Sequence, residues 1–297
     1  MGNEPLISVI IPAWNRCGLL ERAVASALGQ TLADVEVLIV DDGSTDGTEA
    51  RWSREPDPRI RYIRQEHGGA CRARNRGLAE ARGKYAAFLD SDDTWVRDKL
   101  EKQKAFLEQT GAEIVFCAFR HIDGNGRVTV RPGERFQAGQ IRKEQLLAEN
   151  AVSTQTIFGK TECLREVGFD EAFPRLQDWD FALRMAGKYR VYYDPTPMAD
   201  VYLQGDSISG DPSKAFRAIR MIHDKNIGDY ARNFEASMAL MTAYYEFGSA
   251  AGEDCANNCL LLMNLGRSLR ENGAILARTG WLRWKQARSG CLKKKQP

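Results

Sequence analysis

The fold of this chain is decided by the stretch Tyr85-Ala86-Ala87-Phe88-Leu89-Asp90-Ser91-Asp92-Asp93. Its first five residues are apolar, as is typical of a short buried strand, and three carboxylates follow within four positions. Acids this close repel one another unless a proton or a cation relieves them. Carboxylate oxygens suit a hard divalent ion, Mg²⁺ or Mn²⁺, that also binds phosphate. A surface turn, with Asp93 or Thr94 capping the next helix, explains the same residues, so the surrounding sequence has to decide.

Strands and helices alternate through the first 120 residues. Apolar runs predict strands, besides residues 85–89, at 6–11, 35–40, 60–63 and 113–119. Pro12 is expected to end the first of these strands. Apolar residues at helical spacing predict the intervening helices, at 17–29, from about 48, from about 68 and at 95–110. This order predicts an α/β fold whose parallel sheet has right-handed crossovers and helices on both faces.

The predicted strands share a feature at their carboxyl ends. Polar residues follow them, namely Asn15, Asp41, Asp42, Asp90, Asp92 and Asp93. In a parallel sheet those ends converge on one edge, where open α/β sheets bind their ligands. The acids are therefore interpreted as parts of a single site rather than as separate turns.

The pattern is less regular after residue 120. Short strands are predicted at 128–130, 156–159, 191–193 and 198–203, with Pro195 and Pro197 separating the last two. Helices are predicted around 146–147, at 161–167 with Thr161 as its cap, and at 177–186. Strand signals stop near Ser213, and the remaining predicted helices are 213–224, 229–249, 253–272 and an amphipathic one within 274–297.

Charge is distributed unevenly along the chain. Residues 211–297 carry 14 Lys/Arg and 8 Asp/Glu, a balance of +6, whereas the first 210 residues carry 28 and 32, a balance of −4. A basic C-terminal region of this kind suggests an anionic partner. We expect peripheral contact with an anionic membrane and no nucleic acid; a solvated terminus is the alternative.

The cysteines and the hydropathy bear on location. Seven scattered cysteines without a CxxC pair favour a reducing compartment. The sequence shows no signal peptide, and no apolar run approaches the roughly 20 residues that span a bilayer. The expected location is the cytoplasm, including the inner face of the cell membrane.

Five motifs occur in an order and spacing that resemble family 2 glycosyltransferases. They are Pro12-Ala13-Trp14-Asn15, Val40-Asp41-Asp42-Gly43-Ser44-Thr45-Asp46, Gly69-Ala70-Cys71-Arg72-Ala73-Arg74-Asn75, Leu89-Asp90-Ser91-Asp92-Asp93 and Gln177-Asp178-Trp179-Asp180. The resemblance covers roughly residues 5–210. It implies a GT-A fold, with a Rossmann-like donor-binding half (1–120), an acceptor-binding half (121–210) and a helical basic extension (211–297). It also implies transfer of a sugar from a nucleotide donor, usually a UDP-sugar, with inversion at the anomeric carbon.

The resemblance assigns roles to the acidic stretch and the other strand ends. Asp92 is the first choice for a ligand of the divalent metal, with Asp90 holding the ribose or the metal through water. Asp93 either supports these two acids or caps a helix. Asp41 and Asp42 are expected to contact uracil and ribose, with an Asx turn as the alternative. Further residues expected to line the donor pocket are Pro12, Ala13, Asn15 and Ser91.

Arg74 is expected to reach the nucleotide or its phosphates with its planar donor fork; a solvated helix charge is the alternative. Asp178 is the candidate general base for the acceptor hydroxyl and Asp180 its rival, while a capping acid explains either one.

Two departures from the family pattern stand out. Gln177 replaces a common Glu, and the segment Gln204-Gly205-Asp206-Ser207-Ile208-Ser209 lacks the His that completes the metal shell in many relatives.

The expected function is therefore a metal-dependent, inverting glycosyltransferase. Its acceptor is expected to be a cell-surface polysaccharide or a lipid-linked saccharide. The alternatives are a sugar nucleotidyltransferase, a degenerate transferase that only binds nucleotide, and a two-carboxylate glycan hydrolase. The single Arg and single Gly after the first strand, at Arg16 and Gly18, disfavour the nucleotidyltransferase.

Overall fold

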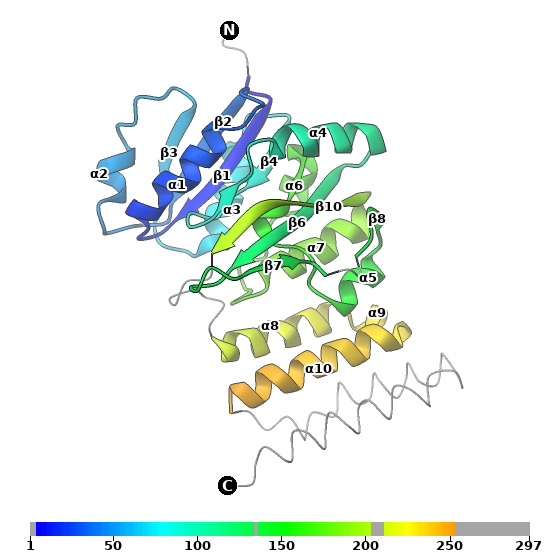
Figure 1. Cartoon of the computed structure of the whole chain (residues 1–297). Helices are drawn as coiled ribbons and strands as arrows, with labels where there is room; N and C mark the ends of the chain where they lie inside the picture. Colours follow the sequence, from blue (N-terminus) through cyan, green and yellow to red (C-terminus); the bar gives the residue numbers. More distant parts are fainter. Residues whose placement is uncertain (1–3, 134–135, 203–210, 253–297) are drawn as a thin grey trace. The chain divides into compact units, whose positions relative to one another are not determined.

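A computed structural model describes residues 4–133, 136–202 and 211–252 of the chain (Figure 1). The chain forms two compact units. The first comprises Met1–Arg142, Ala151–Ala172 and Gln177–Ser207, and the second comprises Lys143–Asn150, Phe173–Leu176 and Ile208–Pro297. The division expected near residue 210 stays a prediction, since two short segments before it group with the second unit.

The first unit is built on a mixed sheet. Over the described residues its strand order is β3-β2-β1-β4-β9-β6-β10-β5, with β7 added to β6 and β8 added to β10. The strands are β1 (Ile7–Ala13), β2 (Val35–Asp41), β3 (Ile60–Arg64), β4 (Tyr85–Phe88), β5 (Thr94–Trp95), β6 (Ile114–Ile122), β7 (Val128–Arg131), β8 (Gly139–Ile141), β9 (Phe158–Lys160) and β10 (Val191–Tyr202). The helices of this unit are α1 (Cys17–Leu28), α2 (Thr48–Trp52), α3 (Ala70–Glu80), α4 (Lys99–Thr110), α6 (Thr161–Val167) and α7 (Gln177–Lys188), with a 3₁₀ turn η1 (Thr154–Thr156).

The direction of strand order reverses at β1. β1 pairs in parallel with β2 on one side and with β4 on the other, and β2 pairs in parallel with β3. The carboxyl ends of β1 and β4 therefore face the crevice at which sheets of this type bind ligands. The α/β class and the convergence of strand ends are as the sequence predicts.

Helices cover both faces of the sheet (Figure 1). α1 and α4 share an apolar core with Ile7, Val9 and Ile11. α3 approaches the opposite face so closely that a Cβ on Gly77 would lie 2.3 Å from Ile10 Cγ2. On that face Phe88 meets Phe181 of α7 edge-on. Because both faces of the sheet are covered, the sequences of the central strands are almost continuously hydrophobic.

Pro12 does not end the first strand, contrary to expectation, because β1 continues to Ala13. The carbonyl of Ile10 accepts a hydrogen bond from Leu89 N, so the backbone groups of Ile10 point toward β4. Because alternate residues of a strand point the same way, the backbone of Pro12 also faces β4. The pairing with β4 stops at Ile10–Phe88. The missing N–H of Pro12 therefore interrupts no ladder.

The segment after the acidic stretch also differs from the sequence expectation. Trp95 lies in a short strand that pairs with Ala199 of β10, and α4 begins only at Lys99. Asp93 and Thr94 therefore do not cap this helix. Pro195 and Pro197 do not split β10, because the strand passes both with register shifts against β6. Thr161 is the first helical residue of α6, and its hydroxyl donates to Gly83 O instead of capping.

The second unit is helical in its described part. It contains α5 (Lys143–Ala148), α8 (Pro212–Lys225), α9 (Ile227–Arg232) and α10 (Phe234–Ala250). The helix predicted at 229–249 is thus two helices, separated at Asn233, whose side chain caps α10 through Ala236 N. The segment 204–209 and the helices and tail predicted beyond residue 252 lie outside the described residues. Among those described, no helix has the length and hydropathy to cross a membrane.

Candidate active site

The ends of β1 and β2 are joined by side chains at the switch point. Ala13 is in register with Asp41, and Asp42 N donates to Ala13 O at 2.8 Å. Asn15 has a left-handed φ of 52°, its N–H donates to Ser44 Oγ at 2.9 Å, and its Oδ1 accepts from Thr45 N at 2.8 Å. The structure therefore brings the first two motifs together, and Asn15 serves to connect their loops.

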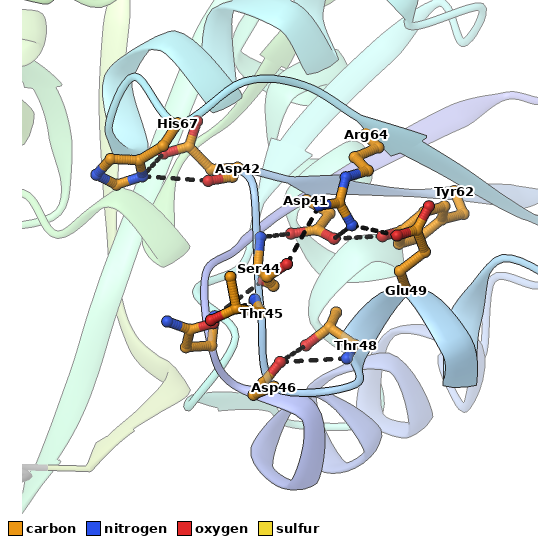
Figure 2. Close-up of polar contacts among 11 residues, drawn as sticks. Asp41, Asp42, Ser44, Thr45, Asp46, Thr48, Glu49, Tyr62, Arg64 and His67 are labelled. Carbon is orange, nitrogen blue, oxygen red and sulfur yellow. Dashed lines mark hydrogen bonds and ion pairs between the residues drawn. The ribbon is translucent and has the colours of Figure 1, made fainter.

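Asp41 is completely buried, and Figure 2 shows its carboxylate among Ser44, Tyr62 and Arg64. Its carboxylate accepts a hydrogen bond from Ser44 N at 2.8 Å and another from the Tyr62 hydroxyl, and Arg64 Nη1 lies 3.8 Å away. Burial together with the Asp41 carboxylate raises the pKa of Tyr62, which keeps this hydroxyl a donor. The Asx-type turn considered from sequence is present at Asp41.

Asp42 is also buried, but its carboxylate points to a different loop. Oδ1 accepts from Gly68 N at 2.9 Å and from Gln65 Nε2 at 2.7 Å, while Oδ2 accepts from Gly69 N at 2.7 Å and lies 2.9 Å from His67 Nδ1. Three donors and the His67 ring nitrogen surround the Asp42 carboxylate. Asp42 thus ties the end of β2 to the start of α3. Contact of either Asp41 or Asp42 with a base or a ribose stays a prediction.

An aromatic pair stands beside this loop. The indole of Trp14 is 50% exposed and stacks on His67 with 4.6 Å between ring centroids. Their contact could not be predicted from the sequence, because they are 53 positions apart and His67 was interpreted as an ordinary polar residue. The aromatic residue in the first strand-end loop was the signal that could have pointed to this place.

Arg74 carries a buried positive charge at the same edge of the sheet. Its residue is 6% exposed, and Nη2 donates to Asp90 Oδ1 at 2.7 Å. Nε and Nη1 are buried and have no hydrogen-bond partner within the part of the chain that the structure describes. Burial by itself lowers the pKa of Arg74, but nearby groups, Asp90 foremost and Asp178 among them, outweigh it and raise that pKa. Arg74 is therefore not the solvated helix charge that sequence allowed.

The acidic stretch divides into two kinds of carboxylate. Asp93 is buried, and its oxygens accept from Gln155 Nε2 at 2.6 Å and from Tyr202 N at 3.0 Å. Burial, followed by the charges of Asp90 and Asp92, raises the pKa of Asp93 well above its usual value. Asp90 and Asp92 remain partly exposed. Ser91, between them, is buried.

Asp90 and Asp92 fit the oxygen-donor chemistry of Mg²⁺ or Mn²⁺. Their repulsive effect on Asp93 shows that negative charge accumulates at this loop. Among the described residues, no group of three His, Cys, Asp or Glu side chains converges as a metal cage. Mg²⁺ sites are commonly built on one or two carboxylates together with oxygens of the bound phosphate.

The two candidate bases at the start of α7 differ in surroundings. Asp180 is buried and forms an ion pair with Arg184, with distances of 2.8 Å to Nε and 2.7 Å to Nη2. Asp178 is half-buried, accepts a hydrogen bond from Trp179 N at 2.8 Å, and acts on the pKa of Arg74. Asp178 thus shares the electrostatic environment of the donor-side arginine, whereas Asp180 is engaged within its own helix.

Comparison with known proteins agrees with this arrangement. The sequence profile of "Glycosyl transferase family 2" matches residues 8–165, more than half of the chain. The chain belongs to glycosyl transferase family 2. The match includes every strand end described above, from β1 to the acidic stretch.

Family 2 relatives are found in several bacteria. The chain is 43% identical over 199 residues to the "Putative teichuronic acid biosynthesis glycosyltransferase TuaG" of Bacillus subtilis, covering 55% of this chain and 79% of that one. It is 31% identical over 194 residues to the "Putative colanic acid biosynthesis glycosyl transferase WcaA" of Escherichia coli, covering 64% and 69%. An uncharacterized glycosyltransferase of Rickettsia felis is 32% identical over 214 residues, but the match spans 71% of this chain and only 35% of that protein.

Solved structures confirm the fold. Residues 1–349 of TarS from S. aureus, in complex with UDP-GlcNAc, align with a TM-score of 0.68 at 19% identity, covering 89% of this chain and 81% of that one. The mannosyltransferase PcManGT from Pyrobaculum calidifontis, in complex with GDP-Man and Mn²⁺, aligns with a TM-score of 0.60 at 19% identity, covering 99% and 89%. The predicted GT-A fold is confirmed, and the C-terminal region is helical in its described part, residues 211–252.

Proposed function

We propose that this chain catalyses transfer of a sugar, with inversion, from a nucleoside diphosphate donor to a hydroxyl of a saccharide acceptor. The observation that carries the proposal is the buried guanidinium of Arg74, whose Nε and Nη1 have no hydrogen-bond partner among the described residues. Buried donors of this kind are costly unless a ligand satisfies them. A diphosphate supplies anionic oxygens to a planar fork, and charge-assisted hydrogen bonds to such oxygens are strong.

The donor diphosphate needs a second source of positive charge as its bond to the sugar breaks. Asp92 and Asp90 are the residues that would hold a divalent metal ion at this place, with the diphosphate completing its shell. When bound, such an ion stabilises the negative charge on the leaving group. Pairing with Arg74 Nη2 orients the Asp90 carboxylate beside the guanidinium. Asp93 supports the loop through Gln155 and Tyr202.

The nucleoside is assigned to the loops after β1 and β2. Asn15, Ser44 and Thr45 hold these loops together, and Pro12 and Ala13 form the adjoining strand end. Asp41 supports the loop after β2 by accepting from Ser44 N, and Asp42 connects the end of β2 to the loop before α3 by accepting from Gly68 N. UDP is the proposed nucleotide, supported by the fold shared with TarS, which was solved with UDP-GlcNAc.

Asp178 is the proposed general base. Its half-buried carboxylate would accept the proton of the acceptor hydroxyl as that oxygen attacks the anomeric carbon. Asp180 is the weaker choice, because the Arg184 guanidinium occupies its carboxylate. The acceptor proposed is a saccharide of a cell-surface polysaccharide, in keeping with the names of the Bacillus and Escherichia relatives.

The proposed location is the cytoplasm, with the basic C-terminal region resting on the inner face of the membrane. Cosedimentation with anionic lipid vesicles tests this part. Removal of residues 274–297 should lower the bound fraction, and an unchanged bound fraction would contradict it.

A thermal-shift screen of UDP, GDP, dTDP and CMP, with and without Mn²⁺, tests the proposed donor class. A ligand that binds only the native state raises apparent stability by about 2.7 kcal/mol at a concentration 100 times its Kd. We expect UDP to raise Tm, and the rise to grow when Mn²⁺ is present. Asp92→Ala should remove the Mn²⁺-dependent part alone. Folded protein that responds to none of the four nucleotides would contradict the proposal.

A further inference from the structure

Phe169 lies between α6 and α7, outside every motif that pointed to the donor site. The residue is 4% exposed. Its ring stacks on Phe181 with a centroid separation of 4.1 Å and an interplanar angle of 8°, and it meets Phe88 edge-on at 5.2 Å. The guanidinium carbon of Arg74 lies 5.4 Å from the centroid of the Phe169 ring. A rigid aromatic surface therefore borders the buried cation.

Asn75 fixes Phe169 in this position. Asn75 Nδ2 donates to Phe169 O at 2.9 Å, and Phe169 N donates to Asn75 Oδ1 at 2.7 Å, so the amide binds both backbone groups of one residue. The same Nδ2 also reaches Glu171 Oε1 at 3.1 Å. Asn75 directly follows Arg74 on α3. One turn of one helix thus supplies the cation and anchors the ring that it faces.

The Arg74 fork needs such a support. Among the described residues, Arg74 makes one direct hydrogen bond, from Nη2 to Asp90. No other polar contact there restricts rotation of the guanidinium plane about this hydrogen bond. An aromatic face within about 6 Å attracts a guanidinium and favours a defined orientation of its plane. The ring thereby restricts the directions in which Nε and Nη1 can point.

We propose that Phe169 is a positioning residue of the donor site, which holds the Arg74 fork in the orientation that receives the diphosphate. This inference rests on the proposed function. Phe169 acts through Arg74, and Asn75 acts through Phe169. Because the Phe169 ring also stacks on Phe181 of α7, it links the helix that carries Arg74 to the helix that carries Asp178.

Isothermal titration calorimetry with UDP and with uridine, both in Mn²⁺, tests the inference. Phe169→Leu retains an apolar side chain but removes the ring, and should weaken UDP binding by about 3- to 30-fold. Its affinity for uridine, which has no phosphate, should be unchanged. Phe181→Leu is the matched control, because Phe181 belongs to the same stack and is also buried, but its ring lies against Arg184 instead of Arg74. This control should retain wild-type UDP affinity.

A double-mutant cycle separates positioning from a merely structural role. In an Arg74→Ala background, Phe169→Leu should cause no further loss of UDP affinity. Equal losses in both backgrounds, equal losses for UDP and uridine, or wild-type UDP affinity in Phe169→Leu would each overturn the inference while leaving the proposed function intact. Wild-type protein that binds no UDP would overturn both. Should Phe169→Leu fail to fold, Asn75→Ala takes its place in the same cycle, with the same expectations.

Discussion

At the scale of single residues, aspartates that are close together in the sequence differ in burial and in hydrogen-bond partners. Asp90, Asp92 and Asp93 are neighbours, yet only Asp93 is fully enclosed by hydrogen bonds from Gln155 and Tyr202. Asp178 and Asp180 are two positions apart, yet Asp180 is buried in an ion pair of 2.7 Å with Arg184, whereas Asp178 is half-buried. An acceptor hydroxyl would therefore have to displace the Arg184 guanidinium to reach the Asp180 carboxylate.

Substitution of the two α7 acids tests this division. Asp178→Asn should preserve UDP affinity and reduce transfer by about 10²- to 10⁴-fold, the range typical for loss of a general base. Asp180→Asn should act mainly on stability, because it leaves the Arg184 guanidinium without its counterion. Nucleotide titration, product formation and Tm of each variant distinguish these effects. Normal turnover by Asp178→Asn, with loss in Asp180→Asn, would reverse the assignment.

At the scale of elements, one side chain connects β2 to α3. The Asp42 carboxylate binds the N–H groups of Gly68 and Gly69 immediately before α3, and Gly69 has a φ of 90° that favours glycine. Arg74 lies one turn into that helix. The position of the buried cation therefore depends on a carboxylate that follows a different strand.

Replacing Asp42 should lower the stability of the protein even when no nucleotide is bound, because it removes this connection. Asp42→Ala removes the acceptor for Gln65 Nε2, Gly68 N and Gly69 N, and we expect a loss of about 2 kcal/mol in the free energy of unfolding, typical of hydrogen bonds to a charged group. Asp98→Ala, which removes an exposed ion pair with Lys102, is the control and should cost no more than about 0.5 kcal/mol. Urea denaturation of the apo-proteins measures both. Equal stability of the two variants would refute the structural role of Asp42.

The sequence predicted the elements better than their connections. The strand ends of β1, β2 and β4 were located because apolar runs stop at polar residues, and parallel strands align those ends. The short strand at Trp95 was missed because it depends on pairing with Ala199, more than 100 residues later. Phe169 was missed for the same reason, since its contacts with Arg74 and Asn75 join distant segments. Helical periodicity cannot reveal such contacts, since they depend on tertiary structure.

At the scale of the whole molecule, the first unit retains a cation in its core that the proposed chemistry does not use. Lys99 is completely buried, its Nζ donates to Gln103 Oε1 at 2.6 Å, and it lies 4.1 Å from the Trp95 ring centroid. Burial lowers the pKa of Lys99 to about 8, against the small opposing effect of Cys117. Gln103 in turn donates to Thr156 O, so the lysine also supports the turn that carries Gln155.

Stability should therefore rise with pH in a defined window. Between pH 8 and 10.5 the unfolded chain holds a proton on Lys99 that the folded chain has released, so raising the pH favours folding. The full effect corresponds to about 3 kcal/mol at 1.36 kcal/mol for each pKa unit. Lys99→Met should be more stable than wild type at pH 7, and the difference should shrink as the pH approaches 10.5. Parallel urea titrations at several pH values measure this difference, and a pH-independent difference would contradict the explanation.

The central claim is that the buried Arg74 guanidinium binds the diphosphate of the donor, and calorimetric titration of UDP into matched variants tests it most directly. Arg76 lies two residues after Arg74 on α3, is about half exposed and forms an ion pair with Glu80. Arg76→Ala therefore removes the same charge from the same helix but leaves the proposed site unchanged. We predict that Arg74→Ala lowers UDP affinity by at least about 10-fold, as expected for loss of a charge-assisted hydrogen bond. Arg76→Ala should bind UDP as wild type does. Equal UDP affinity in Arg74→Ala and Arg76→Ala would contradict the account.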